Sequence, residues 1–253
     1  MAPISVTIIA RDEADRIGEA IASVGFADEV LVVESGSSDG TADVARAAGA
    51  RVVQLDWPGH TAQKQRAVEL ASHEWVLSLD ADERVDPALA AEICDLALDE
   101  TTMRGFTVRR RTWWQGAPIS WGTWSPDRRV RLFRRDSARH RGPDPHDQVV
   151  VDGPVGALDG VLHHHAYRDL ADHLNTIARY SEIFVEESHR QGIHARWVDI
   201  LVRPPAHLFK ALVVKQGWRD GVRGLCIAGL GASAVLLKWG LLKLRAAADG
   251  DVQ

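Results

Sequence analysis

The sequence has little of what marks several common classes of protein. Cys94 and Cys226 are its only cysteines among 253 residues, so a disulfide framework or a cysteine-based zinc site is not expected. No signal-peptide pattern precedes the first apolar run, and with so little cysteine this leads us to expect a reducing, cytosolic setting. The apolar stretch between Arg223 and Lys238 has fourteen uncharged residues, fewer than the about 20 that span a bilayer.

A glycine-rich loop is also missing after the first apolar run. Arg11, Asp12 and Glu13 stand where a hydride-transferring Rossmann enzyme carries G-x-G-x-x-G, so we set that class aside. Acidic residues instead follow the first, second and fourth predicted strands. This pattern favours a nucleotide held by base and ribose contacts together with a metal-bridged diphosphate.

Four apolar, β-branched runs alternate with helical patterns in the first part of the chain. Asp12 is placed to cap the first of these helices. The alternation predicts an α/β fold, with a mostly parallel, doubly wound sheet and helices on both faces. The predicted strands cover residues 4–10, 29–33, 51–55 and 75–79, with two later strands at 107–111 and 130–134 and helices at 60–71, 86–97 and 171–187.

The fourth apolar run ends abruptly in two acids, Asp80 and Asp82. Ligands of open α/β sheets bind beyond the carboxyl ends of the strands, so we expect these carboxylates to lie at a substrate site. Two carboxylates one residue apart suit a hard divalent cation. Asp249 and Asp251 repeat the pattern in the polar tail, which shows that the spacing alone means little and that its place after a strand carries the inference.

Positive charge is concentrated in two blocks, although the net charge is −5. Residues 104–141 hold eleven Arg against two Asp, and residues 196–245 hold nine Lys or Arg against two Asp. Scattered basic residues commonly form solvated faces, whereas clustered Arg suits phosphates because its planar fork binds oxyanions with two hydrogen bonds. A nucleic-acid partner is not expected, since the whole chain is acidic and no known binding module is present.

Several stretches of the chain resemble a known family. The first half contains SVTIIARDE, VVESGSSDGT, AQKQRA and WVLSLDADER, and resembles the nucleotide-sugar half of the inverting family 2 glycosyltransferases of the GT-A fold. The second half contains RLFRR, PHDQVVVDGP, LHHHAYRDL and RPPAHLFK, and extends the resemblance to the bacterial lipopolysaccharide core β-1,4-glucosyltransferase-like branch. The resemblance runs from about residue 4 to residue 244.

The resemblance implies a role for several residues at the donor site. It places Glu13, Glu34 and Asp39 beside the nucleoside, although family members usually carry Asp where this chain has Glu34. Asp82 is implied as a ligand of Mg²⁺ or Mn²⁺, and Asp80 as a contact of the ribose or the metal shell. The remaining expected contacts are Lys64 with the diphosphate, Arg131 near phosphate and His164 on the metal.

Simpler roles stay open for some of these residues. Asp39 fits a helix cap as well as a ligand contact. Lys64 fits a solvated helix residue. His163, His164 and His165 cannot all bind one ion, because consecutive residues of a strand point to opposite faces, and each also fits a hydrogen-bonded surface histidine.

An acceptor site is expected in the second half. Four tryptophans, Trp113, Trp114, Trp121 and Trp124, lie in a segment broken by Gly and Pro, where they suit either stacking on an acceptor sugar or local packing. An inverting transfer needs a base for the acceptor hydroxyl. The family resemblance points to His146 and Asp147, with His146 at the acceptor and Asp147 as the catalytic base, and Asp127 is the reserve candidate.

The predicted domain boundary lies between residues 168 and 169. We expect a catalytic domain at 1–168, with its donor half at about 1–100 and its acceptor half at about 101–168. A helical appendage at 169–253 is expected to lie in the membrane interface, with basic residues toward lipid phosphates. Within this appendage, the segment Arg203–Pro205 is expected to break the chain. Packing on the enzyme itself or in a dimer interface is the alternative.

These expectations combine into one function. The chain is expected to be a metal-dependent transferase that moves glucose from UDP-glucose to a lipid-linked saccharide such as lipopolysaccharide core. It would work as a peripheral protein on the cytosolic face of the inner membrane. The rival interpretations are a polyprenyl-phosphate glycosyltransferase and a non-catalytic nucleotide-sugar-binding protein.

Overall fold

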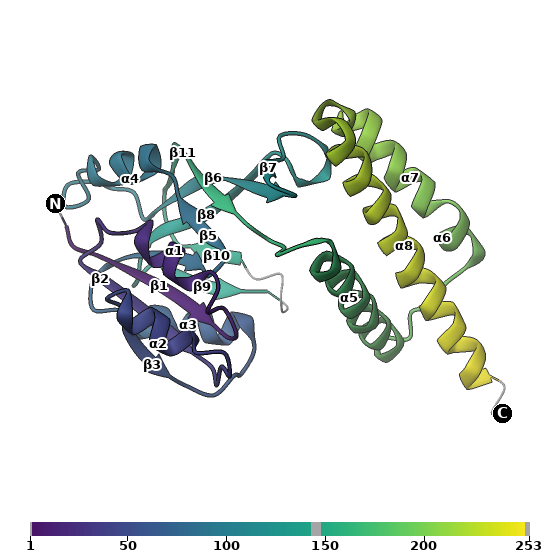
Figure 1. The fold of residues 1–253 in the computed structure, drawn as a ribbon, viewed down its shortest axis with the longest axis horizontal. Coiled ribbons are helices and arrows are strands. Elements are labelled where there is room, and N and C mark those ends of the chain that lie inside the picture. The colour runs from purple at the N-terminus through teal and green to yellow at the C-terminus, as the bar shows by residue number, and fades with distance from the viewer. Residues whose placement is uncertain (1, 143–147, 251–253) are drawn as a thin grey trace. The chain divides into compact units, whose positions relative to one another are not determined.

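The computed structural model of the protein describes residues 2–142 and 148–250 (Figure 1). The strands are β1 (Ile4–Ala10), β2 (Glu29–Glu34), β3 (Arg51–Gln54), β4 (Trp75–Asp80), β5 (Glu83–Val85), β6 (Gly105–Trp114), β7 (Ala117–Pro118), β8 (Asp127–Arg134), β9 (Ala138–Arg141), β10 (Gln148–Val151) and β11 (Val155–His164). The α-helices are α1 (Ile17–Ala22), α2 (Thr41–Ala47), α3 (His60–Leu70), α4 (Pro87–Cys94), α5 (Leu170–Arg190), α6 (Trp197–Leu201), α7 (Arg203–Phe209) and α8 (Gly221–Gly250). The remaining helical elements of the described residues are short: the 3₁₀ turns η1 (Gly122–Trp124) and η3 (Gly217–Asp220), and the π-helical segment η2 (Lys210–Val214).

The chain divides into two compact units. The first unit comprises Met1–Arg111 and Asp127–His164, and is named the catalytic unit because the sequence leads us to expect catalysis there. The helical unit comprises Thr112–Pro126 and His165–Gln253. The chain passes from one unit to the other after residues 111, 126 and 164, whereas the sequence placed a single boundary after residue 168. The tryptophan-rich segment differs from expectation, because it belongs to the helical unit rather than to the catalytic one.

One mixed sheet forms the centre of the catalytic unit. Its strand order is β3-β2-β1-β4-β8-β6-β11-β5, with β7 paired to β6. β3, β2, β1 and β4 run parallel, β8 is antiparallel to β4, and β6 is antiparallel to β8. The expected α/β sheet is thus confirmed, and the parallel pairing expected for it holds for β3, β2, β1 and β4, the half that carries the loops after β1, β2 and β4.

Helices cover both faces of this sheet, as the alternation of apolar residues in the strands requires. Ile4, Val6 and Ile8 of β1 are almost fully buried in the larger core, which includes residues of α1, α2 and α4. Ile9 of the same strand packs on the opposite face, where Ala67 of α3 completes a separate cluster. Because successive strand residues point to opposite faces, one strand joins two cores, and each buried Ile contributes about 1.5–3 kcal/mol.

The helical unit contains α5 to α8. The segment Arg203–Pro205, predicted as a chain break, is instead the first turn of α7, where the missing N–H of proline costs nothing. The segment Gly217–Ala248 is long and apolar enough to cross a membrane, because an 18-residue window within it has a mean hydropathy of 1.8, and 17% of that window is buried. Helix α8 packs against α5, α6 and α7 within this unit.

Candidate active site

The loops after β1 and β2 are tied together by short acids. Asp39 Oδ1 accepts hydrogen bonds from the amide and hydroxyl of Thr41, at 3.0 and 2.5 Å, and Oδ2 accepts one from the amide of Ala14 at 3.0 Å. These donors, led by the Thr41 hydroxyl, lower the pKa of Asp39. Asp39 therefore holds the start of α2 against the neighbouring loop, which supports the capping role left open by the sequence.

Asp12 is not an N-cap, contrary to our prediction. Helix α1 begins later, at Ile17, and its N-cap position is Arg16. Asp12 has a φ of 55° and accepts a hydrogen bond from the amide of Ser38 at 2.9 Å. The acid thus stabilises the pairing of the two loops rather than the helix that follows it.

Two glutamates flank these loops in different environments. Glu34 is 1% exposed, and its carboxylate accepts hydrogen bonds from the amide of Ser37 and, at 3.0 Å, from the side chain of Gln54. Burial alone would raise the pKa of Glu34, but these donors lower it, so the group is held as a carboxylate. Glu13 is more open, and its Oε2 lies 3.3 Å from Nε of Arg16.

The acidic turn after β4 is closed by basic side chains from other elements. Asp80 Oδ1 lies 2.8 Å from Nζ of Lys64 on α3, and Asp80 Oδ2 accepts a hydrogen bond from Arg131 of β8 at 2.8 Å. The Asp80 amide donates to Glu83 Oε2 at 3.0 Å. Burial would raise the pKa of Asp80, but Lys64 and Arg131 hold it well below its usual range. Asp80 is therefore negatively charged, which suits the role implied for it as a contact of the ribose or the metal shell.

Arg131 reaches this turn through an irregularity in the sheet. Phe106 of β6 pairs with Leu132, and the next residue, Thr107, pairs with Val130, so Arg131 is the extra residue of a β-bulge. Its side chain is 7% exposed and also donates to Glu83 Oε1 at 2.5 Å. Burial alone would lower the pKa of Arg131, but Glu83 and Asp80 raise it, so it stays cationic.

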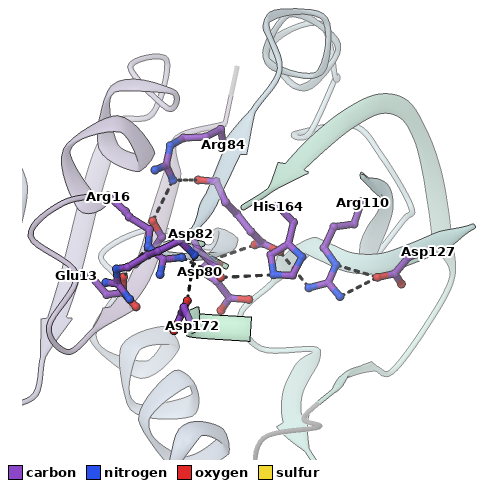
Figure 2. Close-up of polar contacts among 12 residues, drawn as sticks. Glu13, Arg16, Asp80, Asp82, Arg84, Arg110, Asp127, His164 and Asp172 are labelled. Carbon is purple, nitrogen blue, oxygen red and sulfur yellow. Dashed lines mark hydrogen bonds and ion pairs between the residues drawn. The ribbon is translucent and has the colours of Figure 1, made fainter. Parts of the chain in front are cut away.

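Asp82 points toward a different pair of side chains, as Figure 2 shows. Its Oδ2 lies 3.5 Å from Nε2 of His164 on β11 and 3.9 Å from a terminal nitrogen of Arg16. Burial would raise the pKa of Asp82 and His164 lowers it, with a net lowering. Asp82 Oδ1 is buried and has no hydrogen-bond partner among the described residues.

This arrangement fits a divalent cation in part. Among residues 2–142 and 148–250, no group of three His, Cys, Asp or Glu side chains converges in a way that could hold a metal ion alone. Asp82 and His164 nevertheless bring an unpaired carboxylate oxygen and an imidazole nitrogen to one place. Carboxylate and imidazole are both common metal ligands, and Mg²⁺ sites typically take further ligands from substrate phosphates and water.

The reserve base, Asp127, is already engaged. Arg110 donates to its Oδ2 from Nε and from a terminal nitrogen, both at 2.8 Å, and Arg129 donates to its Oδ1 at 2.9 Å (Figure 2). A carboxylate with both oxygens bound by guanidinium groups is poorly placed to take a proton from a substrate. His146 and Asp147, the preferred candidates, lie outside the residues that the structure describes.

The four tryptophans take several packing roles in the helical unit. Trp114 is 7% exposed, packs with Ile119 and Ile227, and donates from Nε1 to Nδ1 of His173 at 3.2 Å. These contacts favour the packing interpretation for Trp114, as does the contact of Trp124 with the same cluster. Trp113 stacks on His165, and Trp121 lies under Arg219 with 3.8 Å between the ring centroid and the guanidinium carbon.

Some residues of the turn had no assigned role in the sequence. Glu83 is fully buried and joins Asp80, Arg131 and Arg110. In the sequence, its position directly after Asp82 was the one feature that could have indicated a role in this turn. Arg16 and Arg110 had none, because their partners are fixed by strand and loop packing rather than by a local pattern.

Comparisons with known proteins agree with this geometry. The model of the family described as glycosyl transferase family 2 matches residues 5–146. The chain is 30% identical over 237 residues to the lipopolysaccharide core biosynthesis glycosyltransferase LpsC of Rhizobium meliloti, covering 91% of this chain and 88% of that protein. It is 28% identical over 204 residues to an uncharacterized glycosyltransferase of Rickettsia typhi, covering 76% and 70%.

Solved structures are more distant. Mannosyl-3-phosphoglycerate synthase from Rubrobacter xylanophilus aligns with a TM-score of 0.48 and 18% identity, covering 76% of this chain and 75% of that one. Glucosyl-3-phosphoglycerate synthase from Mycobacterium tuberculosis, solved with Mn²⁺ and UDP, aligns with a TM-score of 0.47 and 21% identity, covering 76% and 81%. Structural likeness alone does not assign an activity. The family model and the curated relatives do show the family: this chain belongs to glycosyl transferase family 2 and is a glycosyltransferase.

Proposed function

We propose that the protein is a metal-dependent, inverting glycosyltransferase that transfers glucose from UDP-glucose to a lipid-linked saccharide of the lipopolysaccharide core. The observation that carries the proposal is the buried, unpartnered Oδ1 of Asp82 beside His164, next to a charged Asp80. The relative LpsC is named for lipopolysaccharide core biosynthesis, which supports the acceptor class.

The donor lies, in this proposal, across the carboxyl ends of β1, β2 and β4. Glu13, Glu34 and Asp39 border the nucleoside, because the loops that they stabilise meet at this edge. Each carboxylate has about four lone-pair sites, so oxygens that already bind a backbone amide can still accept a hydroxyl of the ribose.

The diphosphate lies beside Asp82 and His164, with Arg16, Lys64 and Arg131 as the nearby cationic side chains. A divalent cation, Mg²⁺ or Mn²⁺, bound by Asp82 and His164 would supply a Lewis acid that offsets charge on the departing nucleotide. Asp80 keeps Lys64 and Arg131 in place, because each of its oxygens accepts a hydrogen bond from one of them. Because these cations are already held in place, their side chains need not rearrange when the bond between the sugar and the diphosphate breaks.

The acceptor hydroxyl gives up its proton to Asp147 as it attacks the anomeric carbon from the face opposite the diphosphate. His146 is proposed to contact the same acceptor. Among the tryptophans, Trp113, Trp121 and Trp124 stay candidates for sugar stacking, since each is only half-buried. The helical unit is proposed to lie against the cytosolic face of the inner membrane, where the lipid-linked acceptor is found.

The test is release of UDP from UDP-glucose in the presence of Mn²⁺ or Mg²⁺. Asp82→Ala should lower the rate by about 10²-fold or more, since loss of several kcal/mol of charge stabilisation costs tenfold per 1.4 kcal/mol. Asp43→Ala is the matched control, because Asp43 is an 87% exposed acid of α2 whose ion pair is with Arg46. The control should keep the parent rate.

A thermal-shift screen of nucleotide sugars with Mn²⁺ identifies the donor, because a ligand of the native state raises the melting temperature. Equal UDP release by the parent and by Asp82→Ala, or a rate that EDTA leaves unchanged, would exclude the metal-dependent mechanism. No stabilisation by any uridine nucleotide would exclude UDP-glucose as donor.

The alternative acceptor is a polyprenyl phosphate, and the arginines near Asp80 favour it enough to be tested. An acceptor that is already anionic needs no base. Asp147→Asn with unchanged UDP affinity should therefore abolish transfer to a sugar hydroxyl and leave transfer to a lipid phosphate intact.

A further inference from the structure

A cavity of about 470 Å³ adjoins Asp80 in the catalytic unit. Neutral residues of β6, β8 and β10 form part of its wall. The charged part of the wall consists of Lys64, Asp80, Arg110, Arg128, Arg129 and Arg131. Lys64, Asp80 and Arg131 of this wall also belong to the proposed donor site, whereas Arg110, Arg128 and Arg129 do not. The cavity therefore extends beyond the proposed donor contacts and offers further cations to a second anionic group.

The cavity wall carries more positive than negative charge. Its five cationic side chains face one acid, Asp80, while Glu83 and Asp127 pair with them from outside the wall. Asp159 pairs with Arg128 but its side chain is 83% exposed, so solvent screens it. Among the described residues, the five cations still outnumber these four acids. An electropositive cavity of this kind attracts anions.

Unused hydrogen-bond donors remain in this wall. Arg129 uses Nε to bind Asp127, and its terminal nitrogens make no hydrogen bond to the described residues. A planar guanidinium with free donors suits the oxygens of a phosphate, which accept paired hydrogen bonds.

Arginines that stand opposite each other in the pairing of β6 with β8 differ in whether they line the cavity. Arg109 of β6 stands opposite Arg128 of β8 in the register, and both pair with Asp159. Arg128 lines the cavity and Arg109 does not. The cavity therefore depends on particular members of the arginine-rich block rather than on its total charge.

We propose that this cavity binds a phosphate monoester carried by the acceptor. The assignment of this phosphate to the acceptor rests on the proposed function, whereas the binding of a phosphate compound can be measured whether or not that function is correct. Two sources share this chemistry: a phosphorylated sugar of the saccharide and the phosphate of a lipid carrier. Glucose 6-phosphate and geranyl phosphate represent these sources, and glucose is the neutral counterpart.

The test is isothermal titration of the three compounds into the full-length protein, first saturated with UDP and Mn²⁺ so that the donor phosphates are in place. One of the two phosphates should bind, and glucose should not. Arg128→Gln and Arg129→Gln should each weaken that binding by about tenfold, the usual order for one hydrogen bond to a charged group. Arg109→Gln removes the same charge from the same ladder and should leave the affinity unchanged.

The phosphate that binds identifies the source. The proposal is overturned if neither phosphate binds to the parent protein, or if Arg128→Gln and Arg129→Gln bind as tightly as Arg109→Gln. Stabilisation by UDP and Mn²⁺ is recorded separately for each variant. If UDP and Mn²⁺ do not stabilise the protein but the phosphate compound still binds, the proposed donor is contradicted and the cavity proposal is not. If UDP and Mn²⁺ stabilise the protein but neither phosphate compound binds, the cavity proposal is contradicted and the proposed donor is not.

Discussion

Single residues of the acidic turn differ in what they can do because their oxygens differ in what they already bind. Both oxygens of Asp80 are bonded to cations, so its charge positions Lys64 and Arg131. One oxygen of Asp82 is buried without a partner. Burying a carboxylate oxygen that has no hydrogen bond to the described residues is unfavourable, and a bound cation would offset that cost. This is the environment expected of a metal-ligating carboxylate.

Glu29, at the start of β2, gives a pH-dependent prediction at the same scale. Its carboxylate accepts hydrogen bonds from Ser5, from the amide and hydroxyl of Ser72, and from Arg51. Burial raises its pKa, but these donors lower it from 4.5 to about 2. Because the folded pKa lies below the unfolded one, the stabilisation is complete above pH 4.5 and is lost as the pH falls toward 2.

Glu29→Gln should therefore lower the free energy of unfolding by roughly 3 kcal/mol at pH 7, since one pKa unit corresponds to 1.36 kcal/mol. Urea unfolding of the parent and the variant at pH 7, 5, 4 and 3 measures the difference, which should shrink below pH 4.5. Glu19→Gln is the control, because Glu19 is 79% exposed and its single ion pair is expected to contribute little. A difference that stays constant with pH would contradict the assignment.

At the scale of elements, Gly160 sets how closely β11 approaches α4. A Cβ added to Gly160 would overlap Cα of Leu89 and lie 2.8 Å from its backbone nitrogen. The Gly160 amide also donates to Glu92 of α4 at 2.8 Å. Gly160→Ala should lower the free energy of unfolding by about 1–3 kcal/mol through overpacking, measured by urea unfolding.

The control for this substitution is Gly229→Ala in α8. A Cβ added there meets nothing within 4 Å, and alanine favours a helix by about 0.5–1 kcal/mol. The control should be neutral or more stable. Equal destabilisation by both substitutions would show that the approach of β11 to α4 is not the cause.

Elements with a strong local period could be predicted from the sequence. The strands β1, β2, β3 and β4 fall within one residue of their predicted ends, because a buried parallel strand is a continuous apolar run. The start of α7 was mistaken for a break, since the proline pair Pro204-Pro205 ends one helix and begins another with equal ease. The bulge at Arg131 depends on pairing with β6 and has no local signal.

In the candidate site, too, residues with a local sequence pattern could be predicted, and residues whose role depends on distant partners could not. Asp80 and Asp82 lie at the edge where the sequence placed them, because their position after a strand fixes that edge. Asp39 has the loop contacts of a cap, a role that the sequence left equal to ligand binding. Trp114 is buried beside His173, and no pattern in an aperiodic segment could distinguish that from a surface platform. Glu83 is missed for a similar reason, because its partners come from β6 and β8.

For the whole molecule, the exposed apolar surface of the helical unit gives a membrane prediction. Trp197, Phe209 and Trp218 are 65%, 60% and 64% exposed. Four exposed basic residues lie in the same stretch of chain, namely Lys210, Lys215, Arg219 and Arg223. Aromatic side chains beside exposed cations suit the interface of an anionic bilayer.

The full-length protein should therefore sediment with vesicles of phosphatidylethanolamine and phosphatidylglycerol, and less so at high salt. Replacing Trp197, Phe209 and Trp218 together by Ser should abolish sedimentation with the vesicles. A control variant with Val44→Ser and Leu70→Ser, which changes exposed apolar residues of the catalytic unit, should still bind. If the parent does not bind vesicles and the triple variant turns a dimer into a monomer in analytical ultracentrifugation, the surface is a subunit interface.

The pairing of Asp80 with Arg131 across 51 residues also bears on the order in which the enzyme matures. A ribosome releases the acidic turn well before the guanidinium that neutralises it, and before the histidine on β11. A nascent chain that stops short of β8 thus has Lys64 beside Asp80 but lacks Arg131, which binds the other oxygen of Asp80. Non-local contacts of this kind form late in folding. Competence to bind a nucleotide sugar should therefore arise only when translation has passed β11.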